Sequence, residues 1–164
     1  MPVITFIIPY RTLPERPGRL ARLVHTLHQQ LEPGMELIVS DQSEHFTGAA
    51  QDLAHAYILE PRETFNRARA INLGVGMARN NWICVLDVDV MPRQGFCKDV
   101  LAHLPRYFLT YCIFIVMEGN HRHFDPPYYW GSDVHLFSKG LWYDAGRYCE
   151  EYEGYGYEDV DFCD

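Results

Sequence analysis

Two carboxylates, Asp87 and Asp89, stand one residue apart at the end of an apolar run that covers residues 82–86. An unbroken apolar run of this kind, bounded by polar residues, is typical of a buried strand in a parallel sheet. In open α/β sheets, ligands bind beyond the carboxyl ends of such strands. Two hard oxygen ligands there suit Mg²⁺ or Mn²⁺, ions that usually complete their shell with substrate phosphates. The alternative interpretation is a plain acidic turn after a strand.

Arg11, Arg67 and Asp41 are predicted to lie at the same edge of the sheet. Arg11 directly follows the first predicted strand, and Arg67 lies at the N-terminus of a predicted helix. Guanidinium groups suit diphosphate oxygens and helix N-termini favour anions, although each arginine alone also fits a plain surface position. Asp41, at the tip of the second predicted strand, could accept a hydrogen bond from a base N–H or a ribose hydroxyl. A turn or helix-capping role is the alternative for Asp41.

A second pair of carboxylates, Glu158 and Asp159, follows a Gly-Tyr-Gly-Tyr sequence at 154–157. The glycines permit close approach of a ligand, and tyrosine rings offer the flat amphipathic surface that suits the face of a sugar. A carboxylate at this place could act as a general base on a hydroxyl. The alternative is helix capping, because the macrodipole stabilises carboxylates at a helix start.

Alternating strands and helices are predicted to position these residues in the first half of the chain. Strands are predicted at 3–8, 37–39, 56–59 and 82–86, and Pro9 is expected to stop the first. One helix is predicted between the Pro-Gly pairs at 17–18 and 33–34, where apolar residues recur at helical spacing. Another is predicted at 65–79, although Gly74 and Gly76 weaken that pattern. The alternation indicates an α/β fold with a mostly parallel, doubly wound sheet and flanking helices. Right-handed crossovers would bring the strand ends to one edge.

The second half of the chain has a less regular pattern. A helix is predicted at 95–104, strands at 107–116 and 134–137, and a short helix that begins at 138–139. Residues 118–127 read as a polar loop that carries His121 and His123. Residues 158–164 look like the first turns of a further helix.

Composition narrows the functional classes. With 164 residues, of which 48% are hydrophobic and 22% charged, the chain is expected to form one globular domain over 1–164. A net charge of −8 excludes wholesale binding to nucleic acid. The five cysteines form no Cys-x-x-Cys motif, so neither a zinc site nor a disulfide framework is indicated. Reduced cysteines fit a cytosolic compartment best, so a cytoplasmic location is expected. No signal peptide or transmembrane segment is predicted, and peripheral association with a membrane is compatible with the sequence.

Four motifs occur in the order found in GT-A glycosyltransferases. They are Ile7-Ile8-Pro9-Tyr10-Arg11, Phe65-Asn66-Arg67-Ala68 with Asn72-Leu73-Gly74, Val85-Leu86-Asp87-Val88-Asp89, and Gly154-Tyr155-Gly156-Tyr157-Glu158-Asp159. Over nearly its whole length, the chain resembles the β-1,4-galactosyltransferase-like group and the related family 2 polymerases that transfer N-acetylgalactosamine. The resemblance implies a GT-A (Rossmann-like) fold in a single domain.

The resemblance also implies which residues bind the donor. The uridine pocket and the nucleotide-binding segments would be formed by Pro9, Tyr10, Arg11, Asp41, Phe65, Asn66, Arg67, Asp87, Val88 and Asp89. Asp87 and Asp89 match the Asp-x-Asp motif that holds Mn²⁺ or Mg²⁺, with Asp89 the better candidate for direct metal contact.

For the acceptor side, the resemblance implies that Asp159 is the catalytic base, with Glu158 beside it. Tyr155 would stand where the family commonly has Trp, next to the acceptor sugar, together with Gly154 and Tyr129. Residues of the 128–131 stretch are implied to border the C2 substituent of the donor sugar. Because a large ring leaves less room for an N-acetyl group, galactose is slightly favoured over N-acetylgalactosamine.

The chain departs from the resembled family at both ends. The family usually continues past the Glu-Asp motif and supplies a further metal ligand, often His, from that tail, whereas this sequence stops at Asp164. Animal members also carry an N-terminal membrane anchor, which this sequence lacks. A catalytic domain truncated at its C-terminus is therefore expected, in which His121 or His123 could replace the tail ligand.

These observations together predict an inverting, metal-dependent transferase. It would move galactose or an N-acetylhexosamine from a UDP-sugar to the hydroxyl of a saccharide acceptor, with Asp159 removing the acceptor proton. Two alternatives stay open. One is a nucleotidyltransferase, although 10–17 contains no glycine-rich phosphate loop, and the other is a non-catalytic module that binds a nucleotide-sugar or glycan.

Overall fold

A computed structural model describes residues 3–12, 14, 18–46, 48–102, 104, 110–111, 115–117, 120–122, 134–154 and 162. Within them, no helix is both long enough and apolar enough to cross a membrane.

A six-stranded sheet forms the centre of the molecule, in the order β3-β2-β1-β4-β8-β5. Its strands are β1 (Ile4–Tyr10), β2 (Glu36–Asp41), β3 (Ala56–Leu59), β4 (Trp82–Leu86), β5 (Thr110–Tyr111) and β8 (Val134–Ser138). The four strands β3, β2, β1 and β4 run parallel, and β8 is antiparallel to both β4 and β5. The predicted α/β fold with a mostly parallel sheet is thus confirmed. A separate antiparallel pair is formed by β6 (Ile115–Met117) and β7 (Asn120–Arg122).

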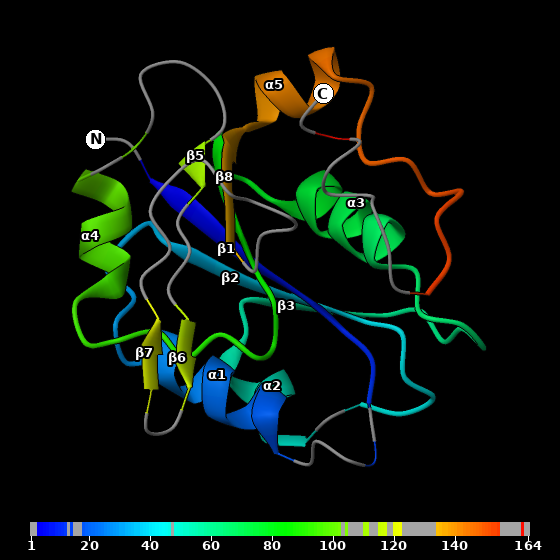
Figure 1. Cartoon of the computed structure of the whole chain (residues 1–164), viewed down its shortest axis with the longest axis horizontal. Coiled ribbons are helices and arrows are strands. Elements are labelled where there is room, and N and C mark those ends of the chain that lie inside the picture. Colours follow the sequence, from blue (N-terminus) through cyan, green and yellow to red (C-terminus); the bar gives the residue numbers. More distant parts are fainter. Residues whose placement is uncertain are drawn as a thin grey trace.

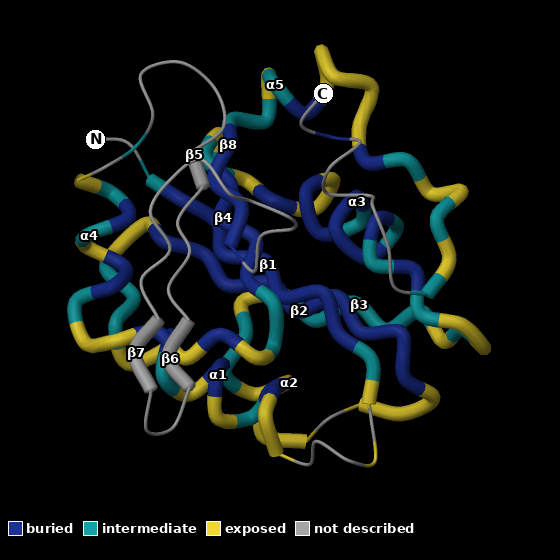
Figure 2. The backbone as a smooth tube through the Cα atoms, in the orientation of Figure 1, coloured by how far each residue is buried: buried dark blue, intermediate teal, exposed yellow. Residues whose placement is uncertain are grey.

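Helices cover both faces of the sheet (Figure 1). They are α1 (Arg19–His28), α2 (Gly48–Leu53), α3 (Arg67–Met77), α4 (Phe96–Ala102) and α5 (Lys139–Asp144). In the central strand β1, Ile4, Phe6 and Ile8 pack into one buried cluster with α1, α2 and α4. Ile7 points to the opposite face and packs with α3 and α5. This alternation follows from the two-residue period of a strand. Figure 2 shows β1, β2 and most of β4 and β8 as buried.

Three sequence predictions need correction. Pro9 does not stop β1, because β1 pairs with β4 only as far as Ile7, while its ladder with β2 continues through Pro9 and Tyr10. A proline is tolerated where a strand has a neighbour on one side only. The predicted loop at 118–127 contains the strand β7, and the predicted strand at 107–116 is divided between β5 and β6. β5 pairs with β8, 24–26 positions away, whereas β6 and β7 pair with each other. All three strands have only two or three residues, which is too short for local periodicity to reveal.

Candidate functional site

The carboxyl ends of β1, β2 and β4 lie at one edge of the sheet and bring the predicted donor residues together. Tyr10 and Asp41, the last residues of β1 and β2, are partners in the parallel ladder. Asp87 follows the last residue of β4 directly. Because parallel strands end on the same side, residues from three separate strands reach this edge, as predicted.

Arg67 and Asp87 form the best-defined ion pair at this edge. The Nε and Nη2 atoms of Arg67 lie 2.9 and 2.8 Å from Oδ1 of Asp87. Arg67 is the first residue of α3, and the preceding Asn66 caps this helix by accepting a hydrogen bond from the backbone N–H of Arg69 at 2.8 Å. The guanidinium of the first residue of α3 therefore contacts the first carboxylate of the Asp-x-Asp motif. Guanidinium groups and helix N-termini both favour an anionic ligand such as a diphosphate.

Asp89 lies on a turn after β4 and pairs with Arg19, the first residue of α1. Both side chains are partly exposed, so solvent weakens this pair and a ligand can displace the guanidinium. The contact was not anticipated from the sequence, because the two residues are 70 positions apart and Arg19 belongs to no recognised motif.

The donor set of Asp87 and Asp89 fits a hard divalent cation. Each carboxylate already faces a guanidinium, so this turn is a place where positive charge is stabilised. Across the part of the chain that the structure describes, no group of three or more His, Cys, Asp or Glu side chains gathers to hold a metal. A cation held by these two carboxylates alone would take its remaining ligands from phosphate oxygens and water, as Mg²⁺ commonly does.

Asp41, the last residue of β2, is fully buried. Its Oδ1 accepts a hydrogen bond from the backbone N–H of Ser43 at 2.8 Å, and its Oδ2 accepts one from the hydroxyl of Tyr57. Ser43 in turn accepts a hydrogen bond at Oγ from the backbone N–H of Thr12 at 2.7 Å. Asp41 therefore organises the turns that follow β1 and β2. Its contact with a nucleobase stays a prediction.

The other predicted donor residues occupy the same region with different exposure. Pro9, Tyr10 and Asn66 are buried, whereas Arg11, Phe65, Arg67 and Val88 are partly exposed. The buried amide of Asn66 is occupied by helix capping and by a hydrogen bond to the backbone oxygen of Glu150. Asn66 is thus placed to shape the nucleotide-binding segment.

Several of the predicted acceptor and catalytic residues lie outside the described residues. These are Tyr129, Tyr155, Glu158, Asp159 and the loop residue His123. Gly154 is described and adopts a φ of 82°, which favours glycine. It forms a parallel bridge with Asn66, so the segment that leads into the Glu-Asp motif lies beside the start of α3.

Further polar residues, which were not predicted as site residues, surround the bridge between Asn66 and Gly154. The backbone N–H of Asn66 donates to Oε1 of Gln42 at 2.8 Å, and Nε2 of Gln42 donates to the backbone oxygen of Asn66 at 3.0 Å. Arg69 pairs with Glu60 and Glu150, which raises the pKa of its guanidinium. Gln42, Glu60, Arg69 and Glu150 stood in no recognised motif and carried no local signal, because each acts through partners in other segments of the chain.

Comparison with protein families gives one match that covers most of the chain. The family described as glycosyl transferase family 2 matches residues 5–150. No curated protein matches the sequence.

Solved structures with similar folds include a galactosyltransferase and a mannosyltransferase. A mutant of Drosophila β1,4-galactosyltransferase 7, in complex with manganese, UDP-Gal and xylobiose, superposes with a TM-score of 0.58 at 18% identity, over 99% of this chain and 59% of that one. A fragment of S. aureus TarS in complex with UDP-GlcNAc gives a TM-score of 0.73 at 14% identity, over 99% and 52%.

The mannosyltransferase PcManGT from Pyrobaculum calidifontis, in complex with GDP-Man and Mn²⁺, gives a TM-score of 0.65 at 15% identity, over 90% of this chain and 48% of that one. At these identities the likeness concerns the fold alone. The chain spans roughly half to three fifths of the length of these three proteins.

Proposed function

The chain belongs to glycosyl transferase family 2, and we propose that it transfers galactose or an N-acetylhexosamine from a UDP-sugar to a saccharide hydroxyl. Its family and its fold agree with the GT-A resemblance noted in the sequence. The observation that carries the proposal is the Asp-x-Asp turn after β4, with Arg67 of the α3 N-terminus against Asp87. Neighbours of the same fold hold UDP-Gal or UDP-GlcNAc, which supports a nucleotide-sugar donor here.

The donor diphosphate would lie between the Asp-x-Asp turn and the start of α3. Arg67 and Arg11 would neutralise the negative charge that grows on the diphosphate as it departs, which is electrostatic stabilisation of the transition state. Asp87 and Asp89 would hold Mn²⁺ or Mg²⁺, and a bound ion supplies Lewis-acid stabilisation to the same leaving group.

Asp159 would act as the general base. As the acceptor oxygen forms a bond to the anomeric carbon, its proton passes to the carboxylate of Asp159, and the bond from that carbon to the diphosphate oxygen breaks, so that UDP leaves with the electron pair. A single displacement of this kind inverts the anomeric configuration. NMR of the product, formed from a donor of known anomeric configuration, tests this step.

The proposal is tested by UDP binding with and without divalent metal. Titration calorimetry in Mn²⁺ should show much tighter UDP binding than in chelator, and Asp89→Ala should abolish the difference. Asp144→Ala is the matched control, because Asp144 is an exposed carboxylate on α5. This helix follows β8 at the end that pairs with the start of β4, so it lies away from the Asp-x-Asp turn that follows the other end of β4. The metal role fails if UDP binds equally well in both conditions, or if Asp89→Ala retains the full metal effect.

The third metal ligand can be identified by the same method. If the nucleotide completes the coordination shell, Mn²⁺ alone should bind loosely, and metal and UDP should strengthen each other's binding by the same factor. If His121 or His123 supplies the ligand instead, Mn²⁺ should bind tightly without UDP and lose that affinity in His121→Ala or His123→Ala.

Enzymatic transfer is tested by UDP release from a panel of UDP-sugars with Mn²⁺ and saccharide acceptors. UDP-galactose is expected to be used slightly better than UDP-N-acetylgalactosamine, because the large aromatic rings around Tyr129 would leave less room for an N-acetyl group. Asp159→Asn should lower the transfer rate by about 10²–10⁴ and leave UDP affinity nearly unchanged. If transfer survives that change within a few fold, Glu158 becomes the candidate base. UDP binding without any transfer would favour the binding module instead.

A further inference from the structure

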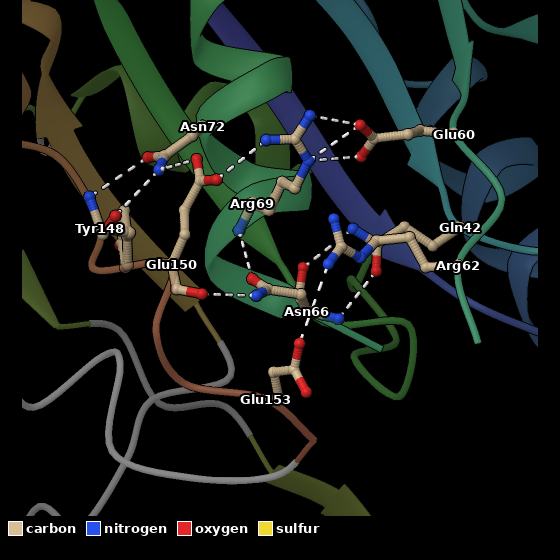
Figure 3. A network of polar contacts seen from close by, with 9 residues as sticks. All are labelled: Gln42, Glu60, Arg62, Asn66, Arg69, Asn72, Tyr148, Glu150 and Glu153. Carbon is tan, nitrogen blue, oxygen red and sulfur yellow. Dashed lines mark hydrogen bonds and ion pairs between the residues drawn. The ribbon is translucent and has the colours of Figure 1, made fainter. Parts of the chain in front are cut away.

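A network of hydrogen bonds and ion pairs fastens residues 148–154 to the first turns of α3 (Figure 3). Asn72, buried in α3, uses both atoms of its amide. Its Oδ1 accepts from Nε1 of Trp142 at 2.9 Å and from the backbone N–H of Tyr148 at 3.2 Å. Its Nδ2 donates to the backbone oxygen of Tyr148 at 2.9 Å and to Oε1 of Glu150 at 2.8 Å. A fully satisfied buried amide specifies one arrangement of the chain segments around it.

Glu150 contacts α3 and its N-cap residue at three positions. Besides the bond from Asn72, its Oε2 lies 3.0 Å from Nη1 of Arg69, and its backbone oxygen accepts from Nδ2 of Asn66 at 2.8 Å. Positions 66, 69 and 72 are three residues apart and therefore lie on one side of the helix. Burial opposes ionisation of Glu150, but hydrogen bonds from Asn72 and Arg69 outweigh it and hold the pKa of the carboxyl below its ordinary value.

The same segment is attached a second time at its far end. The backbone N–H of Gly154 donates to the backbone oxygen of Phe65 at 2.8 Å, and a carboxylate oxygen of Glu153 lies 3.9 Å from Nη2 of Arg62. Residues 65–67 thus have neighbours on two sides. Arg67 contacts Asp87 of the Asp-x-Asp turn, and Phe65 and Asn66 contact the segment that leads into the Glu-Asp motif.

We propose that Glu150 is a positioning residue for the acceptor half of the reaction. It fastens residues 148–154 to α3, and Gly154 at the end of this segment lies five residues before Asp159. Five residues span at most about 17 Å, so the anchor limits the region that the carboxylate of Asp159 can reach. Small displacements of reacting groups lower rates strongly even when binding is intact. This inference rests on the proposed function.

The test compares Glu150→Ala with Glu151→Ala, an exposed neighbour. Glu150→Ala should lower kcat for transfer at least tenfold and leave UDP affinity in Mn²⁺ within about threefold of wild type, because Arg67 and Asp87 are untouched. Glu151→Ala should leave both quantities unchanged. Glu150→Gln keeps the shape of the side chain and an acceptor for Asn72, so its kcat should lie between those of wild type and Glu150→Ala. It also provides the measurement if the alanine variant does not fold.

Hydrogen exchange gives a readout that is independent of turnover. Amides of residues 149–154 should exchange faster in Glu150→Ala, whereas those of β4 should keep their protection. The inference is overturned if kcat is unchanged, or if kcat, UDP affinity and the protection of β4 all fall together, which would be general loss of structure. If the wild type transfers no sugar at all, the proposed function itself fails. If the wild type is active and the Glu150→Ala variant is equally active, only the positioning role of Glu150 fails.

Discussion

Two glycines of α3, Gly74 and Gly76, stand two positions apart and should respond in opposite ways to replacement by alanine. A Cβ atom at Gly74 would lie 2.6 Å from Cγ2 of Ile7 and 3.3 Å from its Cδ1. Ile7 is fully buried in β1, the strand between β2 and β4. A Cβ at Gly76 would meet nothing within 4 Å, and Gly76 is exposed.

The expected magnitudes follow from this difference in space. Alanine is about 1 kcal/mol better than glycine inside a helix, a gain that both variants share, although less fully near the helix end. Inserting a methyl group into a well-packed core typically costs about 1–3 kcal/mol, and here the fully buried side chain of Ile7 would have to shift to make room. Gly76→Ala should therefore stabilise the protein by up to about 1 kcal/mol, and Gly74→Ala should be less stable than Gly76→Ala by about 1–3 kcal/mol.

Urea unfolding of the wild type and the two variants measures these free energies, provided that the slope of free energy against denaturant is the same for all three. A double variant, Gly74→Ala with Ile7→Ala, should show favourable coupling, since removing the isoleucine side chain makes room for the new methyl group. Equal stability changes at the two glycines would refute the close approach of α3 to β1, and the helix would then have to pack further from the sheet.

Further predictions concern a buried carboxyl and two thiols. Burial opposes the charge of Glu36, but hydrogen bonds from Arg79 and Thr5 outweigh it and lower its pKa. The stability that its ionised form supplies is therefore complete above the carboxyl pKa of the unfolded chain and is lost as pH falls through the lower folded pKa. Glu36→Gln should cost about 1–3 kcal/mol at neutral pH and progressively less in acid, measured by urea unfolding, whereas the exposed Glu63→Gln should cost little. If the cost of Glu36→Gln is independent of pH, the ionised carboxyl is not the stabilising species. Burial, with a smaller effect of Glu32, raises the pKa of Cys97 to about 12. Iodoacetamide should therefore label the partly exposed Cys149 well before Cys97 in the folded protein. Equal labelling of the two thiols would contradict the burial of Cys97.

Local sequence pattern was sufficient for the elements that are defined by their own residues. The strands at 56–59 and 82–86 were predicted with the bounds they have, because short apolar runs between turn residues form strands in most contexts. The position of Asp87 and Asp89 beyond β4 followed directly from that strand. The gathering of Arg67 and Asp87 at one edge followed from the handedness of parallel crossovers.

Glycines and prolines in these elements show where local rules are insufficient. Gly74 weakened the helix prediction, yet it lies inside α3, and the tertiary structure supplies the reason in its close approach to Ile7. Pro9 was expected to end β1, but the absence of β4 beside it removes the cost of its missing N–H. In both cases the deciding partner lies in another element.

The sequence by itself therefore determined the fold class and the acidic edge of the sheet, because period, turn residues and crossover handedness are local or general properties. Only the tertiary structure decided that Arg19 faces Asp89, and that Glu150 is held by Asn72 from 78 positions away. Such contacts join polar side chains whose residue types are common throughout proteins. Which of them meet is settled by how the helices pack against the sheet, and a single sequence carries no periodic signal for that packing.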